Sequence, residues 1–196
     1  MIAIGARSRC QINLIKKREL RNNKRLKIMA ENHECSHEGT AGEVSFCFGP
    51  RAPEVYVGVP EHERTSRTLL DSDLCLIDKK HFFIRGCLDI PIIGTSRVFS
   101  WLVWVSLSEK NFNRALDLWK VVGRESEPPY FGWLGTSLLY YLKPLDLKTN
   151  VHTRSVGDRP EIEIEPTDHP LATEQRSGMT LKRAESLAKD LLLEWS

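Results

Sequence analysis

Residues 72–107 read SDLCLIDKKHFFIRGCLDIPIIGTSRVFSWLVWVSL, and this stretch decides the fold. Two long apolar runs, at residues 81–93 and 97–107, are separated by the turn sequence Gly-Thr-Ser at 94–96. Aromatic and β-branched residues are frequent in both runs, which is typical of strands. We therefore predict an antiparallel pair of long strands.

The second run is apolar on both faces of the strand that it predicts. One face holds Phe99, Trp101, Val103, Val105 and Leu107, and the other holds Val98, Leu102 and Trp104. A strand that is buried on both faces lies inside a sheet rather than at its edge. We therefore expect this strand to be central, and we expect the tryptophans at 101, 104, 119 and 133 to be core residues.

Several charged residues interrupt the same stretch, namely Asp73, Asp78, His81, Arg85 and Asp89. A charge inside a sheet must be paired, placed at a rim or used to bind a ligand. Arg85 lies within an otherwise apolar strand, so we expect it to pair with a carboxylate such as Asp168 or to face an anionic ligand.

Helices are expected on both sides of the remaining strands. Four apolar residues between 112 and 119 have helical spacing after the N-cap candidate Ser108, and Gly123 ends that segment. Residues 180–195 place their apolar side chains along one helical stripe. The predicted fold is a single α+β domain, with a mainly antiparallel β-sheet and two or three packed helices that include this C-terminal amphipathic helix.

Shorter elements complete this expectation. Residues 43–48 and 54–57 predict short strands, and Pro60 begins a polar helix through about residue 70. Segments 130–141, 148–155 and 161–165 follow, and the last alternates Ile and Glu as a half-exposed strand does.

The composition is typical of a soluble globular protein, because 41% of the 196 residues are hydrophobic and 28% are charged. No apolar run approaches the roughly 18–20 residues that span a bilayer, so we expect no membrane association. The five cysteines are odd in number and widely spaced, and no secretory pattern precedes them. We therefore expect reduced thiols and a cytoplasmic location.

Positive charge is concentrated at the N-terminus. Residues 1–28 hold nine Lys or Arg and one Glu, a net charge of +8, which leaves −6 in the remainder for the total of +2. We expect residues 1–29 to be a basic extension outside the folded domain, and residues 30–196 to be that domain. The domain offers no basic stripe, so we expect nucleic-acid binding at most through residues 1–28.

Residues 33–37 read HECSH and match the zinc-protease pattern H-E-x-x-H. No apolar helical stripe surrounds the match, so we do not expect a helix that presents two imidazoles to zinc. A structural zinc site from His33, Cys35, His37 and Cys47 is an alternative, although its spacing fits no standard knuckle. Cys35 and His37 are the candidate metal ligands, and we expect no other cofactor.

The candidates for ligand binding are Arg85, His152, Arg159, Asp168 and His169. A carboxylate beside an imidazole, as in Asp168-His169, can orient the ring for acid–base chemistry. Neighbouring side chains on an extended chain point apart, however, and a turn before Pro170 is the simpler interpretation. His152 shares a predicted strand face with other polar residues, which is typical of a solvated surface.

Several segments in series resemble the domain-of-unknown-function family 2199 between about residues 45 and 193. They read SDLC at 72–75, FFIRG at 82–86, WVSLS at 104–108, FGWL at 131–134, LKT at 147–149, RP at 159–160 and EPTDHPL at 165–171. The resemblance implies a small, bacterial, intracellular protein without an assigned activity. Family members often begin with a Cys-x-x-Cys-Gly element and a nearby His, and here only Cys35 and His37 resemble it.

Three classes of function stay open. The first is a binding or regulatory module that recognises a partner through a pocket of Trp, Arg and His side chains. The second is an enzyme of unknown reaction that uses Asp168 and His169, and the third is a degenerate zinc-knuckle protein. The chain lacks the patterns G-x-S-x-G, G-x-G-x-x-G and G-x-x-x-x-G-K, so the first class is favoured.

Overall fold

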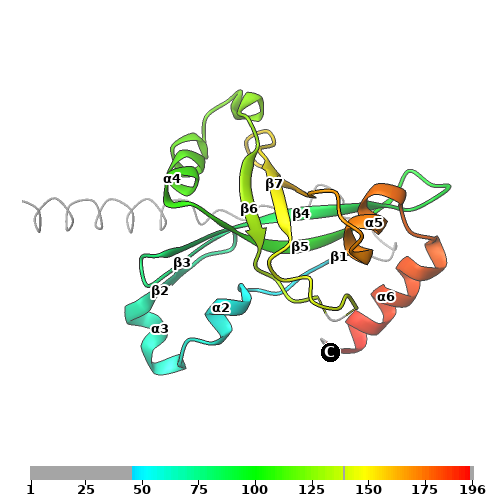
Figure 1. The fold of residues 1–196 in the computed structure, drawn as a ribbon, viewed down its shortest axis with the longest axis horizontal. Helices are drawn as coiled ribbons and strands as arrows, with labels where there is room; N and C mark the ends of the chain where they lie inside the picture. The colour runs from blue at the N-terminus through cyan, green and yellow to red at the C-terminus, as the bar shows by residue number, and fades with distance from the viewer. Residues whose placement is uncertain (1–45, 139, 195–196) are drawn as a thin grey trace, which may run out of the picture.

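The computed structural model describes residues 46–138 and 140–194. In chain order, these residues form β1 (Cys47–Phe48), α2 (Glu54–Val57), α3 (Glu61–Arg67), β2 (Thr68–Leu70), β3 (Leu74–Ile77), β4 (His81–Pro91), β5 (Val98–Leu107), α4 (Glu109–Leu118), the 3-10 helix η1 (Arg124–Ser126), β6 (Tyr130–Leu134), β7 (Lys148–His152), β8 (Glu161–Ile164), α5 (Pro170–Ser177) and α6 (Leu181–Glu194). The described strands belong to one sheet (Figure 1).

The two longest strands, β4 and β5, form the ribbon on which the sheet is built. They pair antiparallel along their whole length, from Phe82 opposite Leu107 to Pro91 opposite Val98. β5 also pairs with β6, β6 with β7, and β7 with β8, all antiparallel. β8 then returns to β4 in parallel, with Glu161 opposite Cys87, so that five strands form a closed ring.

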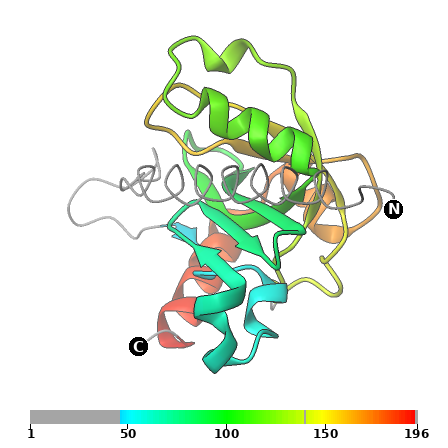
Figure 2. The same cartoon turned by 90° about the vertical axis from the view of Figure 1, so that its left-hand side faces the viewer.

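The main core fills the inside of this ring and its two ends. Helix α4 lies at one end of the ribbon, where Phe112 packs on Phe82 with ring centroids 5.3 Å apart. Helices α5 and α6 lie toward the other end, and the view turned by 90° places α4 and α6 on opposite sides of the strands (Figure 2). Ala184, Leu187, Ala188 and Leu191 of the predicted stripe form the buried face of α6, whereas Leu181 and Leu192 are exposed.

A smaller core lies on the outer face of the ribbon. It consists of Val59, Cys75, Ile77, Phe83 and Trp104, with Tyr56 packed against it. The α2–α3 segment therefore covers the part of β3, β4 and β5 that faces away from the ring. This second core explains why β5 is apolar on both faces.

Both strands of the ribbon change partners at the same level. β4 pairs with β3 through Ile84 and meets β8 at Cys87, while β5 pairs with β6 from Leu107 to Val105 and with β1 at Trp101. Gly86 lies at this change of partner. A Cβ atom there would lie 2.7 Å from the carbonyl oxygen of Pro160, so only glycine lets β8 approach.

The α+β fold, the mainly antiparallel sheet, the central β5 strand and the C-terminal helix are confirmed. Ser108 caps α4 as expected, because its side chain accepts a hydrogen bond from the Asn111 amide. Among the described residues, no helix is long and apolar enough to cross a membrane.

Five local predictions were wrong. Helix α4 ends at Leu118, before the expected end at Gly123. Residues 54–57 form α2 rather than a strand, because Val55 and Val57 are exposed and only Tyr56 packs inward. The polar helix ends at Arg67, and residues 68–70 form strand β2. Helix α5, from Pro170, was not expected. Trp133 is 41% exposed on the outer face of β6 and is not a core residue.

We predict that Trp104→Ala lowers the free energy of unfolding by about 3–5 kcal/mol, because it empties the centre of the second core. Trp133→Ala is the matched control, since its ring is exposed and contacts Phe131 edge-on. That variant should lose about 1 kcal/mol or less in urea melts. Equal losses in the two variants would contradict the placement of Trp104.

We predict that Gly86→Ala destabilises the protein by at least about 1–3 kcal/mol, because the added methyl group collides with Pro160 and Ile162. Gly58→Ala is the control, since its φ of −70° suits any residue and its Cβ would meet only the Val55 carbonyl at 3.6 Å. Thermal unfolding of both variants compares the two sites. An unchanged midpoint for Gly86→Ala would show that β8 does not close the ring.

Candidate functional site

The structure brings two of the five candidate ligand-binding residues together and separates the other three. Arg85 and Arg159 both contact Asp73, at the point where β4 changes partner from β3 to β8. His152, Asp168 and His169 have other neighbours, so the five side chains do not share one set of contacts.

Arg159 and Asp73 form a buried ion pair. Nε of Arg159 lies 2.6 Å from Oδ1 of Asp73, and these residues are 9% and 1% exposed. The Ser72 hydroxyl donates to the other carboxylate oxygen of Asp73 at 2.8 Å. Because Asp73 precedes β3 and Arg159 precedes β8, the pair links the two strands that share one edge of β4.

Arg85 donates hydrogen bonds to backbone carbonyls at the same junction. Its guanidinium lies over the Trp104 ring, 5.6 Å from the centroid, and its two terminal nitrogens donate to the carbonyls of Ser72 and Gly49 at 3.4 and 3.3 Å. The expected pairing of Arg85 with Asp168 is wrong, because Asp168 is exposed in the loop before α5. The two arginines therefore hold the fold together at this junction.

The Asp168-His169 pair has no catalytic geometry. Nδ1 of His169 accepts a hydrogen bond from the Leu171 amide at 3.2 Å, which caps α5, and Nε2 lies 2.8 Å from the Leu142 carbonyl. A carbonyl only accepts, so Nε2 carries the proton and both ring nitrogens are engaged by backbone. His152 pairs instead with the exposed carboxylate of Glu163 at 2.8 Å.

Residues 46–138 and 140–194 show neither an activated cysteine at Cys75 nor a cluster of metal ligands. Burial raises the pKa of the Cys75 thiol to about 12, so this sulfur is an inert thiol at neutral pH. No group of three or more His, Cys, Asp or Glu is placed to hold a metal within these ranges. The candidate ligands Cys35 and His37 lie outside the described residues.

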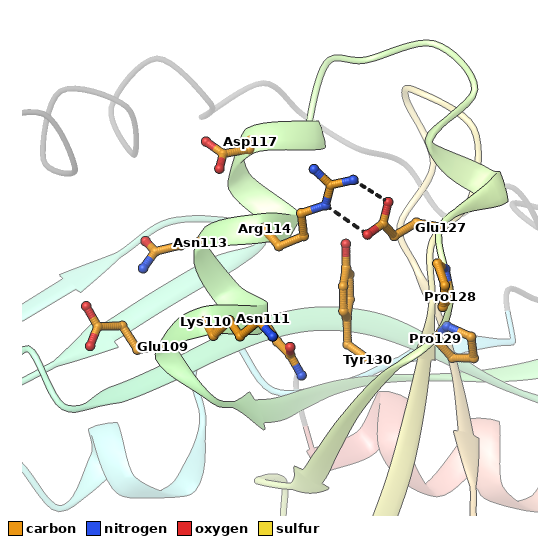
Figure 3. A pocket seen from close by; sticks show the side chains of 10 residues that line it. All are labelled: Glu109, Lys110, Asn111, Asn113, Arg114, Asp117, Glu127, Pro128, Pro129 and Tyr130. Atoms are coloured by element: carbon orange, nitrogen blue, oxygen red, sulfur yellow. Dashed lines mark hydrogen bonds and ion pairs between the residues drawn. The ribbon is translucent and has the colours of Figure 1, made fainter.

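A groove of about 700 Å³ lies between α4 and the segment that leads into β6 (Figure 3). Its lining residues are Glu109, Lys110, Asn111, Asn113, Arg114 and Asp117 from α4, and Glu127, Pro128, Pro129 and Tyr130 from the facing segment. Glu109, Asn113 and Asp117 point away from Tyr130 (Figure 3). The other seven residues form the inner wall and the rim of the groove, which we call the α4–β6 groove.

A bidentate ion pair crosses the α4–β6 groove. Nε and Nη2 of Arg114 each donate to one carboxylate oxygen of Glu127 at 2.8 Å. These hydrogen bonds raise the pKa of Arg114 and lower the pKa of Glu127, so both groups stay charged at neutral pH. The side chain of Arg114 is 52% exposed, so the pair forms the wall that faces solvent.

Tyr130 lies directly beneath this pair. Figure 3 shows its hydroxyl pointing toward Arg114 and Glu127. The residue is 7% exposed, and the hydroxyl oxygen is buried without a hydrogen bond of ordinary geometry. Burial, with the Glu127 charge beside it, raises the pKa of Tyr130, although Thr153 and Arg114 lower it slightly. The phenol is therefore protonated at neutral pH and offers an unused donor.

Sequence reasoning did not single out the groove, because its residues come from two segments that lie apart in the sequence. Arg114 and Lys110 look like ordinary solvated positions of an amphipathic helix, and Tyr130 looks like a strand residue. The only local signal is the Pro128-Pro129 pair, which fixes the backbone that faces the helix.

The structure thus defines a small α+β protein with a groove lined by polar residues, the α4–β6 groove. The chain belongs to a family described as an uncharacterized protein conserved in bacteria (DUF2199), whose model matches residues 33–179. This match confirms the resemblance and assigns no activity. No curated protein and no solved structure matches the chain.

We predict that Asp73→Asn and Arg159→Gln each cost about 3–5 kcal/mol of stability, because either change leaves a buried charge without its partner. The double variant Asp73→Leu with Arg159→Met should recover most of that loss. The exposed pair of His152 and Glu163 is the control and should couple by about 0–1 kcal/mol. A double-mutant cycle in urea measures both couplings, and equal values would contradict a structural role for Asp73 and Arg159.

Proposed function

We propose that this protein is a binding module that holds a small polar ligand in the α4–β6 groove. The observation that carries the proposal is the Tyr130 hydroxyl, which is buried, protonated and without a hydrogen-bond partner beneath the Arg114–Glu127 pair. A buried polar group without a partner costs stability, so its presence calls for an explanation such as a ligand.

The geometry favours binding over catalysis. In the described ranges, the alternative enzyme site at Asp168 and His169 has both imidazole nitrogens committed to backbone groups. The groove itself holds a guanidinium, an ammonium, amides and a phenol, but no imidazole or thiol. Such a set of donors orients and holds a ligand. The carboxylate of the same groove, Glu127, is a weak base because both of its oxygens are bound to Arg114, which lowers its pKa.

The setting that we propose is the cytoplasm, supported by the buried, reduced thiol of Cys75. Zinc at Cys35 and His37 stays a separate proposal that elemental analysis of the full chain tests. Nucleic acid is not the proposed ligand, because the groove includes the Glu127 carboxylate and the chain beyond residue 28 carries net negative charge.

The groove is tested by NMR with four small probes of different chemistry: succinate, inorganic phosphate, glucose and putrescine. We expect at least one probe to shift the amide signals of Lys110, Arg114, Glu127 and Tyr130 in a saturable way. Signals of the Asp73–Arg159 junction serve as the internal control and should stay in place. Four probes without any saturable shift at the groove would overturn the proposal.

We predict that Tyr130→Phe leaves the free energy of unfolding unchanged or raises it by about 1 kcal/mol, because the lost hydroxyl has no partner in the fold. The same change should weaken the probe that binds the groove. Tyr141→Phe is the matched control, since the Tyr141 hydroxyl donates to Glu174 and its removal should cost about 1–2 kcal/mol. A Tyr130→Phe variant that is less stable and binds as well would assign the hydroxyl to folding.

A further inference from the structure

We infer that the ligand of the α4–β6 groove is a compact oxyanion, a carboxylate or a phosphate, and that the Glu127 carboxylate occupies its place in the free protein. This inference rests on the proposed function and specifies the chemistry of the same site. It makes Glu127 a built-in competitor that a ligand must displace.

The donors of the inner wall are the first step of the argument. Arg114 and the Asn111 amide lie on the side of α4 that faces Tyr130, Lys110 lines the outer rim on the helix face of Asp117, and Tyr130 adds a phenol (Figure 3). These groups donate hydrogen bonds, and two of them carry positive charge. The Glu127 carboxylate is the one acidic group of this wall, and both of its oxygens are bound to Arg114.

The geometry of Arg114 is the second step. A guanidinium that presents two parallel N–H groups matches a carboxylate or a phosphate, and Glu127 demonstrates that match at 2.8 Å for both bonds. A free ligand with the same planar pair of oxygens therefore fits the position that Glu127 now fills. A neutral sugar or a polyamine would find no such match.

The position of Tyr130 is the third step. Its hydroxyl lies beneath the ion pair and is shielded from solvent, so a ligand reaches it only when Glu127 moves away. Pro128 and Pro129 restrict the backbone after Glu127, which makes rotation of the Glu127 side chain the simplest movement. An oxyanion held by Arg114 would then accept a hydrogen bond from the Tyr130 hydroxyl, which Glu127 does not accept in the free protein.

The partial exposure of the Arg114–Glu127 pair lets a ligand displace Glu127 from Arg114. The side chain of Arg114 is 52% exposed and that of Glu127 is 19% exposed, so water and salt screen the pair from the Arg114 side, where a ligand can compete with it. The ion pair of Asp73 and Arg159 is harder to displace, because it is buried and the Ser72 hydroxyl binds the second oxygen of Asp73. Arg154 is likewise held between Asp89 and Glu161, at 2.9 and 3.2 Å.

The test compares phosphate and succinate titrations of the full chain with those of three variants, followed by NMR at one ionic strength. Glu127→Gln should bind the anion that the groove takes about fivefold more tightly than the unchanged chain does, because the competitor and its repulsion are removed. Glu125→Gln is the matched control, since it makes the same charge change on an exposed side chain that does not contact Arg114. It should change the affinity by less than about twofold, and Arg114→Gln should abolish binding.

The outcomes separate this inference from the proposed function. Saturable binding of glucose or putrescine in the groove, without binding of either anion to Glu127→Gln, would overturn the oxyanion while the groove remains a binding site. An equal increase of anion affinity in Glu127→Gln and Glu125→Gln would show that only the net charge matters and would overturn the competitor role of Glu127. Shifts with phosphate but not succinate, or the reverse, identify which oxyanion the groove takes. No binding of any probe to any variant would overturn both proposals together.

Discussion

The fold depends on the point at which the central ribbon changes partners on both edges at once. Arg85 and Trp104 are directly opposite each other there, and each binds the backbone of a segment that leaves the sheet. Trp104 donates to the Pro50 carbonyl at 3.2 Å, and its own amide donates to the Thr136 hydroxyl at 2.7 Å. If the edges of β4 and β5 had no partner next to Arg85 and Trp104, their buried backbone groups would lack hydrogen bonds, which costs stability. Asp73, Gly135 and Thr136 satisfy the backbone groups of Arg85 and Trp104, and the side chains of Arg85 and Trp104 in turn donate to the carbonyls of the adjoining loops.

Closure of the ring follows from the same constraint. β3 and β8 run along successive parts of one edge of β4, and the buried Asp73–Arg159 pair joins the segments that lead into them. Gly86 leaves room for Pro160 to approach, and the Cys87 amide donates to the Pro160 carbonyl at 2.9 Å. Two of the charges that interrupt the apolar runs, Asp73 and Arg85, therefore make contacts that join the strands at this junction.

The sequence predicts those features that arise from local periodicity. The two long strands, the central position of β5, the Ser108 cap and the C-terminal stripe all depend on residues close in the chain. Helix α5 escaped prediction because His169, an uncommon cap, begins it in place of the neighbouring Asp168. The pairing of Asp73 with Arg159 spans 86 positions, and the groove joins Arg114 to Tyr130 through the packing of α4 on the sheet. No periodicity in one sequence contains such long-range contacts, and a charged residue in an apolar run indicates only that some partner exists.

The two kinds of arginine site in this protein show how a binding surface differs from a structural one. At the junction, Arg159 is buried and bound by a carboxylate that is itself held by Ser72, so the site is closed to anything else. At the groove, Arg114 is exposed and bound by a carboxylate on a loop side chain, above a phenol that no group satisfies. The same contrast separates Tyr141, whose hydroxyl donates to Glu174, from Tyr130. Arg85, Trp101, Trp119 and Thr149 also hold a buried side-chain atom without a hydrogen bond, but the Tyr130 hydroxyl is the one that borders the α4–β6 groove, under an ion pair that is partly exposed. We therefore propose that a second molecule binds at Tyr130.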